Sequence, residues 1–298
     1  MRIRFLILST LMSAGLFLTS ADTMDDSLQS LKDAVAKKDA AQIKTLATQT
    51  YDEASKVAAG PAETEIDKDK VNEAKETQNY VEYALYTSAI EAETPTKIDL
   101  FQTLEQVNPK SKFLEDGYLY YFQALTDAGD AAKVPGIAEK ALKSLPNSPD
   151  VLAELMNLAA QKNQSGAAAT YAQRLIAALA KRPKSEVIPE AEWVKKKSGM
   201  LGRAHMINGL TLVAQDKNYR ADQELRVALP LASDDVQKAA ILFNLALANY
   251  NLGRVGLNKG QILEAVKFSQ QCAAINGQYQ ALCSKNVTAM KTYAASMH

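Results

Sequence analysis

The chain has 298 residues, of which 47% are hydrophobic and 23% are charged, and its 34 basic side chains balance 34 acidic ones. This composition can fill a sizeable core, and it excludes a wholly disordered chain. The length allows one large domain or two of ordinary size.

The first 21 residues have the layout of a cleavable secretory signal peptide. Arg2 and Arg4 precede an apolar run over 5–18, and small residues precede Asp22. An uncleaved membrane anchor is the alternative, but a helix of this length spans only ~21 Å of a hydrocarbon core of ~30 Å. No cysteine follows the run to carry a lipid anchor. We therefore expect a periplasmic or secreted protein with no membrane span after cleavage, and nucleic acid is not an expected partner.

Charge is unevenly distributed along the chain after this leader. Residues 22–116 carry 11 basic and 20 acidic side chains, net −9, whereas residues 117–298 carry 21 and 14, net +7. Such polarity can orient a partner or pack subunits head to tail. Two solvated surfaces whose composition drifts are the simpler explanation.

Apolar residues recur at helical spacing throughout, without a sustained strand pattern, and the prolines fall between the periodic segments or at their ends. The sequence therefore predicts an all-α chain of paired helices, with a polar loop at 60–69. The expected helices are 26–37, 40–58, 70–92, 96–107, 112–128, 132–144, 149–162, 165–180, 190–215, 219–231, 235–252, 261–275 and 279–296.

Several of these pairs share a register of about 34 residues. Units beginning at Tyr118, His205 and Leu242 align, and Gly209 and Ala246 take the same small position in two of them. In the stretch LFNLALANYNLG (242–253), the final glycine is expected to end the helix in a left-handed turn. About seven extra residues around RVGLNKGQ (254–261) predict a protruding loop.

This pattern resembles the tetratricopeptide repeat, a family of antiparallel helix hairpins that stack into an α-α superhelix. The resemblance implies an N-terminal hairpin and polar loop at 22–69, repeats at 70–277 and a capping helix at 278–298. Family members usually bind a protein or peptide along the concave surface of their first helices. Carried over position by position, that surface comprises Gln123, Asp127, Asn157, Gln161, Arg203, Tyr250 and Asn251. The lysines of the family's carboxylate clamp are missing here, which puts that binding mode in doubt.

Residues suited to catalysis or metal binding are scarce. The chain has two histidines, His205 and the terminal His298, and no recognisable nucleophile, phosphate-loop or metal-ligand motif accompanies them. His205 is expected to be a packed histidine, although an acid beside it in a pocket would favour an enzyme. We expect no catalytic residues, no metal and no cofactor.

Three further groups each leave two interpretations open. Cys272 and Cys283 flank a short turn, and they form either a disulfide or two buried thiols. Tyr80, Tyr83 and Tyr86 follow helical spacing, so core packing is favoured over a role in recognition. Basic side chains crowd residues 181–203; a solvated face is favoured over a site for anionic polymer.

Together these features predict an exported, non-enzymatic scaffold for protein–protein interaction. The alternatives are an envelope module that binds glycan or anionic polymer and, less favoured, an enzyme built on a helical-repeat frame.

Overall fold

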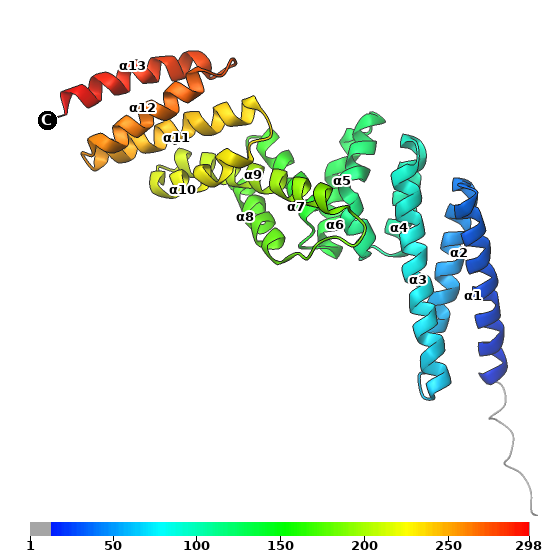
Figure 1. Cartoon of the computed structure of the whole chain (residues 1–298). Helices are drawn as coiled ribbons and strands as arrows, with labels where there is room; N and C mark the ends of the chain where they lie inside the picture. Colours follow the sequence, from blue (N-terminus) through cyan, green and yellow to red (C-terminus); the bar gives the residue numbers. More distant parts are fainter. Residues whose placement is uncertain (1–12, 298) are drawn as a thin grey trace, which may run out of the picture. The chain divides into compact units, whose positions relative to one another are not determined.

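The computed structural model describes the backbone of residues 13–297 and the side chains of residues 23–297. Within that part the chain is all-helical and has no strand, which confirms the all-α fold class (Figure 1). The α-helices are α1 Ser13–Ala36, α2 Ala40–Ala58, α3 Glu65–Glu91, α4 Thr94–Val107, α5 Lys112–Asp127, α6 Val134–Ser144, α7 Pro149–Gln161, α8 Ser165–Lys181, α9 Glu190–Ala214, α10 Asn218–Ala228, α11 Asp235–Val255, α12 Lys259–Ala273 and α13 Gln280–Ser296. Two 3-10 turns, η1 Ala131–Lys133 and η2 Leu229–Leu231, precede α6 and follow α10.

The expected signal peptide lies outside what the structure describes, for residues 1–12 entirely and for residues 13–21 in their side chains. Between residues 13 and 297, no helix combines the length and the hydropathy needed to cross a membrane.

The chain divides into two compact units, Met1–Val134 (unit 1) and Pro135–His298 (unit 2). Unit 1 has an aromatic core in which Phe101 stacks on Tyr121 with ring centroids 5.6 Å apart. Unit 2 is built mainly from leucine, alanine and other small apolar side chains, and its core includes Trp193. Each unit therefore has a core of its own.

The same turn closes five helices, and it explains where they end. The helices are α1, α5, α7, α9 and α11. In each case the backbone takes the left-handed conformation at the second residue after the helix. The N–H of the residue that follows donates to the carbonyl five residues before it, which is the Schellman arrangement. The left-handed residues are Lys38, Gly129, Asn163, Asp216 and Leu257. The chain then enters the following helix after one more residue. These hairpins therefore share one local geometry although their turn sequences differ.

The structure corrects two expectations at the end of LFNLALANYNLG. Gly253 lies inside α11, which continues to Val255, and the left-handed residue is Leu257, with φ of 48°. Gly253 is needed for close packing, because a Cβ there would lie 2.6 Å from the Cδ1 atom of Ile262. The expected protruding loop is also absent, since the extra residues lengthen α11 and only residues 256–258 separate it from α12.

The polar loop at 60–69 is shorter than expected because α3 starts early. The Thr64 side chain accepts a hydrogen bond from the Asp67 backbone N–H, and the Asp67 carboxylate accepts one from the Thr64 backbone. This capping box satisfies two backbone donors that a helix start otherwise leaves free. Helix α3 therefore begins at Glu65, five residues before the expected start.

Candidate functional site

One side of unit 2 brings the first helices of successive hairpins together. The backbones of α7 and α9, of α9 and α11, and of α11 and α13 approach one another, whereas those of α8, α10 and α12 do not. We call α7, α9, α11 and α13 the odd-helix row. When the helices on one side of a stack lie closer together than the helices on the other side, the closer side becomes concave. Five of the expected partner-binding residues, Asn157, Gln161, Arg203, Tyr250 and Asn251, come from this row.

Polar contacts join α7 to α9 along the row. The Arg203 Nε donates to the Asn157 Oδ1 at 2.7 Å, and both side chains are half-buried. The Lys196 ammonium lies 2.9 Å from the Asp150 carboxylate, and the two side chains are only 7% and 2% exposed. A buried ion pair of this kind holds two helices in one register, because removing either charge strands the other.

These contacts change the expectation for the basic stretch at 181–203. Lys196 is buried in its pair with Asp150 and so does not belong to a solvated face. The Lys184 ammonium pairs with the Glu190 carboxylate, and the Arg182 guanidinium lies 5.8 Å from the centroid of the Trp193 ring. Much of this positive charge is therefore engaged within unit 2.

The two expected residues of α11 face different neighbours. Tyr250 packs edge-on against Tyr293 of α13 with ring centroids 5.7 Å apart. Asn251 Nδ2 donates to Asn218 Oδ1 of α10 at 3.4 Å. Asn251 also lines a hollow of about 380 Å³ at the α9–α10 turn, together with Tyr219 and Val255. Tyr250 and Asn251 therefore do not belong to the same surface patch.

Gln123 and Asp127 belong to unit 1. Both are exposed on α5, where the Gln123 Nε2 donates to the Asp127 Oδ1 at 2.8 Å. Gln161, at the end of α7, is also exposed and lies in unit 2. The seven residues are thus divided between the units, and the row in unit 2 carries five of them.

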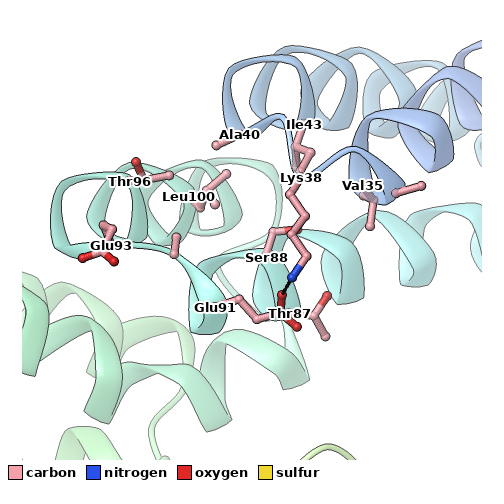
Figure 2. A pocket seen from close by; sticks show the side chains of 12 residues that line it. Val35, Lys38, Ala40, Ile43, Thr87, Ser88, Glu91, Glu93, Thr96 and Leu100 are labelled. Carbon is pink, nitrogen blue, oxygen red and sulfur yellow. Dashed lines mark hydrogen bonds and ion pairs between the residues drawn. The ribbon is translucent and has the colours of Figure 1, made fainter.

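Unit 1 holds a cavity that the sequence did not predict. It measures about 550 Å³ and forms where the α1–α2 turn meets the end of α3 and the start of α4 (Figure 2). Buried Ile43 and Leu100 line it, and an ion pair of 2.8 Å between Lys38 and Glu91 lies among the lining side chains. The lining therefore combines apolar and charged side chains. No motif marks it, because its lining comes from four helices that meet only after folding.

The tyrosines predicted to be core are placed unequally. Tyr86 is 4% exposed, but Tyr83 is 43% exposed and meets Phe113 only edge-on. On α5, Tyr118 and Tyr121 are fully buried, and burial raises the pKa of Tyr121 to about 12. Helical spacing thus placed Tyr86 correctly in the core and misplaced Tyr83 on α3.

His205 has an acidic neighbour. Its Nδ1 lies 2.7 Å from the Glu224 Oε2 across α9 and α10, and the side chains are 17% and 27% exposed. The pair could act as an acid–base couple, as the alternative prediction of an enzyme requires. A catalytic site would also need a nucleophile or a metal beside the pair. No cluster of three or more metal-ligating His, Cys, Asp or Glu side chains occurs in the described part of the chain.

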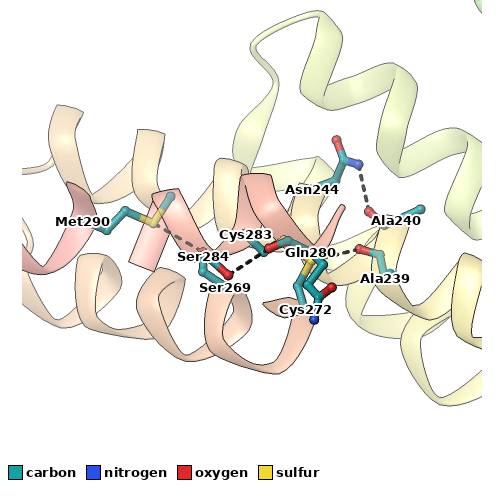
Figure 3. The surroundings of a disulfide bond; sticks show 9 residues. All are labelled: Ala239, Ala240, Asn244, Ser269, Cys272, Gln280, Cys283, Ser284 and Met290. Carbon is teal, nitrogen blue, oxygen red and sulfur yellow. Dashed lines mark hydrogen bonds between the residues drawn. A yellow bond between two sulfur atoms is a disulfide. The ribbon is translucent and has the colours of Figure 1, made fainter. Parts of the chain in front are cut away.

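A disulfide joins Cys272 at the end of α12 to Cys283 at the start of α13 (Figure 3). Their Cα atoms are 5.8 Å apart and both side chains are fully buried. The Cys272 sulfur also lies 3.7 Å from the Ala239 carbonyl oxygen of α11. The bond therefore fixes the last helix of the odd-helix row at the place where α11, α12 and α13 meet.

No family model matches the chain. No curated protein matches it either. The site is therefore interpreted from its own geometry.

Proposed function

We propose that this chain is an exported, non-enzymatic scaffold of the tetratricopeptide type, and that the odd-helix row of unit 2 binds a protein or peptide partner. The observation that carries the proposal is the one-sided approach of α7, α9, α11 and α13. Such a row exposes side chains from several hairpins to one extended ligand. Export rests on the leader-like residues 1–21 alone.

The hairpin turns support the repeat assignment. The left-handed residues Gly129 and Asn163 are 34 residues apart, which is the repeat length of the family. The later intervals, Asn163 to Asp216 and Asp216 to Leu257, are longer, mainly because α9 and α11 have 25 and 21 residues where α7 has 13. These spacings support placing the chain in this architecture, as a degenerate member, in which the stack would form a superhelix.

The polar character of the row supports a peptide ligand. Asn157 and Arg203 are held by each other at 2.7 Å, so their geometry is set before a ligand arrives. Preorganised amide and guanidinium groups bind peptide backbone and carboxylate groups at a low cost in conformational entropy. Gln161 adds an exposed amide at the end of α7.

Site-specific photo-crosslinking tests this proposal. A crosslinking side chain at Gln161 should capture a discrete partner when the protein is expressed in its own compartment. The control places the same group at Gln173, an exposed glutamine on α8, which lies outside the row. Equal capture from both positions, or none from Gln161, would reject the row as the binding surface.

A substitution separates binding from folding. Gln161→Arg should weaken capture of that partner about tenfold, because a bulky cation replaces a neutral amide. Gln173→Arg should leave capture unchanged. Both side chains are exposed, so neither change should move the thermal unfolding curve.

A further inference from the structure

The hollow beside Asn251 is both apolar and basic. Tyr219 and Val255, which line it, are 66% and 89% exposed. Lys217 and Arg220 line it too. Against these two cations stands one carboxylate, that of Asp216. We call this the basic hollow.

The turn next to the basic hollow contains a residue whose backbone conformation is unfavourable. Leu257 follows Val255 by two positions, has φ of 48° and is 78% exposed. A left-handed backbone strains a residue that has a large apolar side chain, and glycine or asparagine relieves that strain. An exposed leucine gains nothing within the fold to offset this cost. Exposed apolar side chains gathered at one place mark a surface that becomes covered.

A complementary surface lies in unit 1, at the turn between α2 and α3. Ile66 is 68% exposed there, and it is the second residue of α3. Residues 60–69 around it carry Glu63, Glu65, Asp67 and Asp69 against the single cation of Lys68. We call this segment the acidic tip. The capping box lowers the pKa of Asp67, which keeps its carboxylate charged beside the isoleucine.

The net charges of the units extend this complementarity. Residues 22–134 carry 12 basic and 22 acidic side chains, net −10, whereas residues 135–298 carry 20 and 12, net +8. Charges of opposite sign on two surfaces steer them together and set which faces meet. Copies of this chain therefore attract one another most strongly when unit 1 of one copy meets unit 2 of the next.

We infer that the chain self-associates head to tail, with the acidic tip of one copy seated in the basic hollow of the next, Ile66 packing on Tyr219 and Val255. This inference goes beyond the partner-binding row and does not depend on it. The two surfaces differ, so the contact is heterologous, and each added copy leaves one tip and one hollow free. Association then continues into a ring or an open chain.

Sedimentation of the full chain at increasing concentration tests the inference. At about 50 mM salt the average mass should rise with concentration, and at about 500 mM it should fall back towards the monomer because salt screens the charges. A monomer at every concentration and salt would overturn the inference.

Two single substitutions should each raise the dissociation constant at least about tenfold: Ile66→Asp in the tip and Arg220→Glu in the hollow. Matched controls exist for both. Val236 is 67% exposed and, like Ile66, is the second residue of its helix, so Val236→Asp repeats the first change elsewhere. Lys267 is exposed on α12, so Lys267→Glu repeats the charge reversal. Equal losses in a control would overturn the assignment of the surface.

Mixing the two variants gives the sharpest result. The Ile66→Asp copy keeps an intact basic hollow and the Arg220→Glu copy keeps an intact acidic tip, so the mixture should form dimers and nothing larger. Each variant alone should remain monomeric. A mixture that stays monomeric, or that recovers the wild-type size distribution, would contradict a head-to-tail contact.

Discussion

The two units use similar hairpins but stack them differently. In unit 2 only the odd-numbered helices approach their second neighbours, whereas in unit 1 α2 approaches α4 and α3 approaches α5 as well. Small residues allow close packing within the hairpins of unit 2, because a Cβ on Gly209 of α9 would lie 2.5 Å from Leu225 of α10. Unit 1 instead fills its interior with aromatic rings. Hairpins of one kind therefore give a one-sided row in unit 2 and packing on both sides in unit 1.

The largest expected effect concerns the aromatic core of unit 1. Phe101 is fully buried against Tyr86 and Tyr121, so Phe101→Ala should lower the free energy of unfolding of unit 1 by about 3–5 kcal/mol. Trp193, the single tryptophan, belongs to unit 2 and reports on that unit by fluorescence. Its transition should stay in place while hydrogen exchange in unit 1 accelerates. A matching shift at Trp193 would show that the units unfold together.

The disulfide should contribute to the stability of unit 2. Replacing Cys272 and Cys283 with alanine should lower the stability of unit 2 by about 2–3 kcal/mol, the chain-entropy value for a loop of this size. The Trp193 transition measures this loss. Wild-type protein in reductant should behave like the double variant. A denaturing assay that finds two free thiols in protein kept without reductant would instead mean that the bond does not form.

Glycines of α9 should show how closely unit 2 is packed. A Cβ at Gly202 would lie 2.6 Å from the Leu231 carbonyl oxygen, so Gly202→Ala should destabilise unit 2 by about 1–3 kcal/mol. Gly199 lies in the same helix with open space around it, and Gly199→Ala should raise stability by about 0.5–1 kcal/mol. Chemical denaturation of the two variants should therefore give shifts of opposite sign.

The smallest effect should appear in alkali, in unit 1. Burial raises the pKa of Tyr121 to about 12, above its ordinary value near 10, so the folded state favours the neutral ring. The stabilisation is complete below pH 10 and is lost as the pH rises towards 12. The urea midpoint of unit 1, followed by circular dichroism, should therefore fall over this range. Tyr121→Phe, which cannot ionise, should reduce that dependence, and an unchanged pH profile would show that Tyr121 does not contribute.

The sequence predicted most of the helices because their limits are local. Prolines and turn residues mark ends such as that of α5 before Gly129, and apolar spacing gives the buried side. The predictions that were wrong concern features that depend on contacts between segments distant in the sequence. Gly253 resembled a helix end, but it lies inside α11 to admit Ile262. The sequence favoured a solvated position for Lys196, but its ammonium is paired with the carboxylate of Asp150, which lies 46 residues earlier in the chain. The cavity near Lys38 likewise exists only where four helices converge.

The covalent link near the C-terminus has a consequence for proteolysis. Gly277 is exposed in the turn that the Cys272–Cys283 bond spans. A protease that nicks the chain there would cut the backbone without freeing the final helix, which would stay tethered through sulfur. Only a reductant would then release the C-terminal fragment, so the cleaved and intact molecules would migrate alike until that bond was broken.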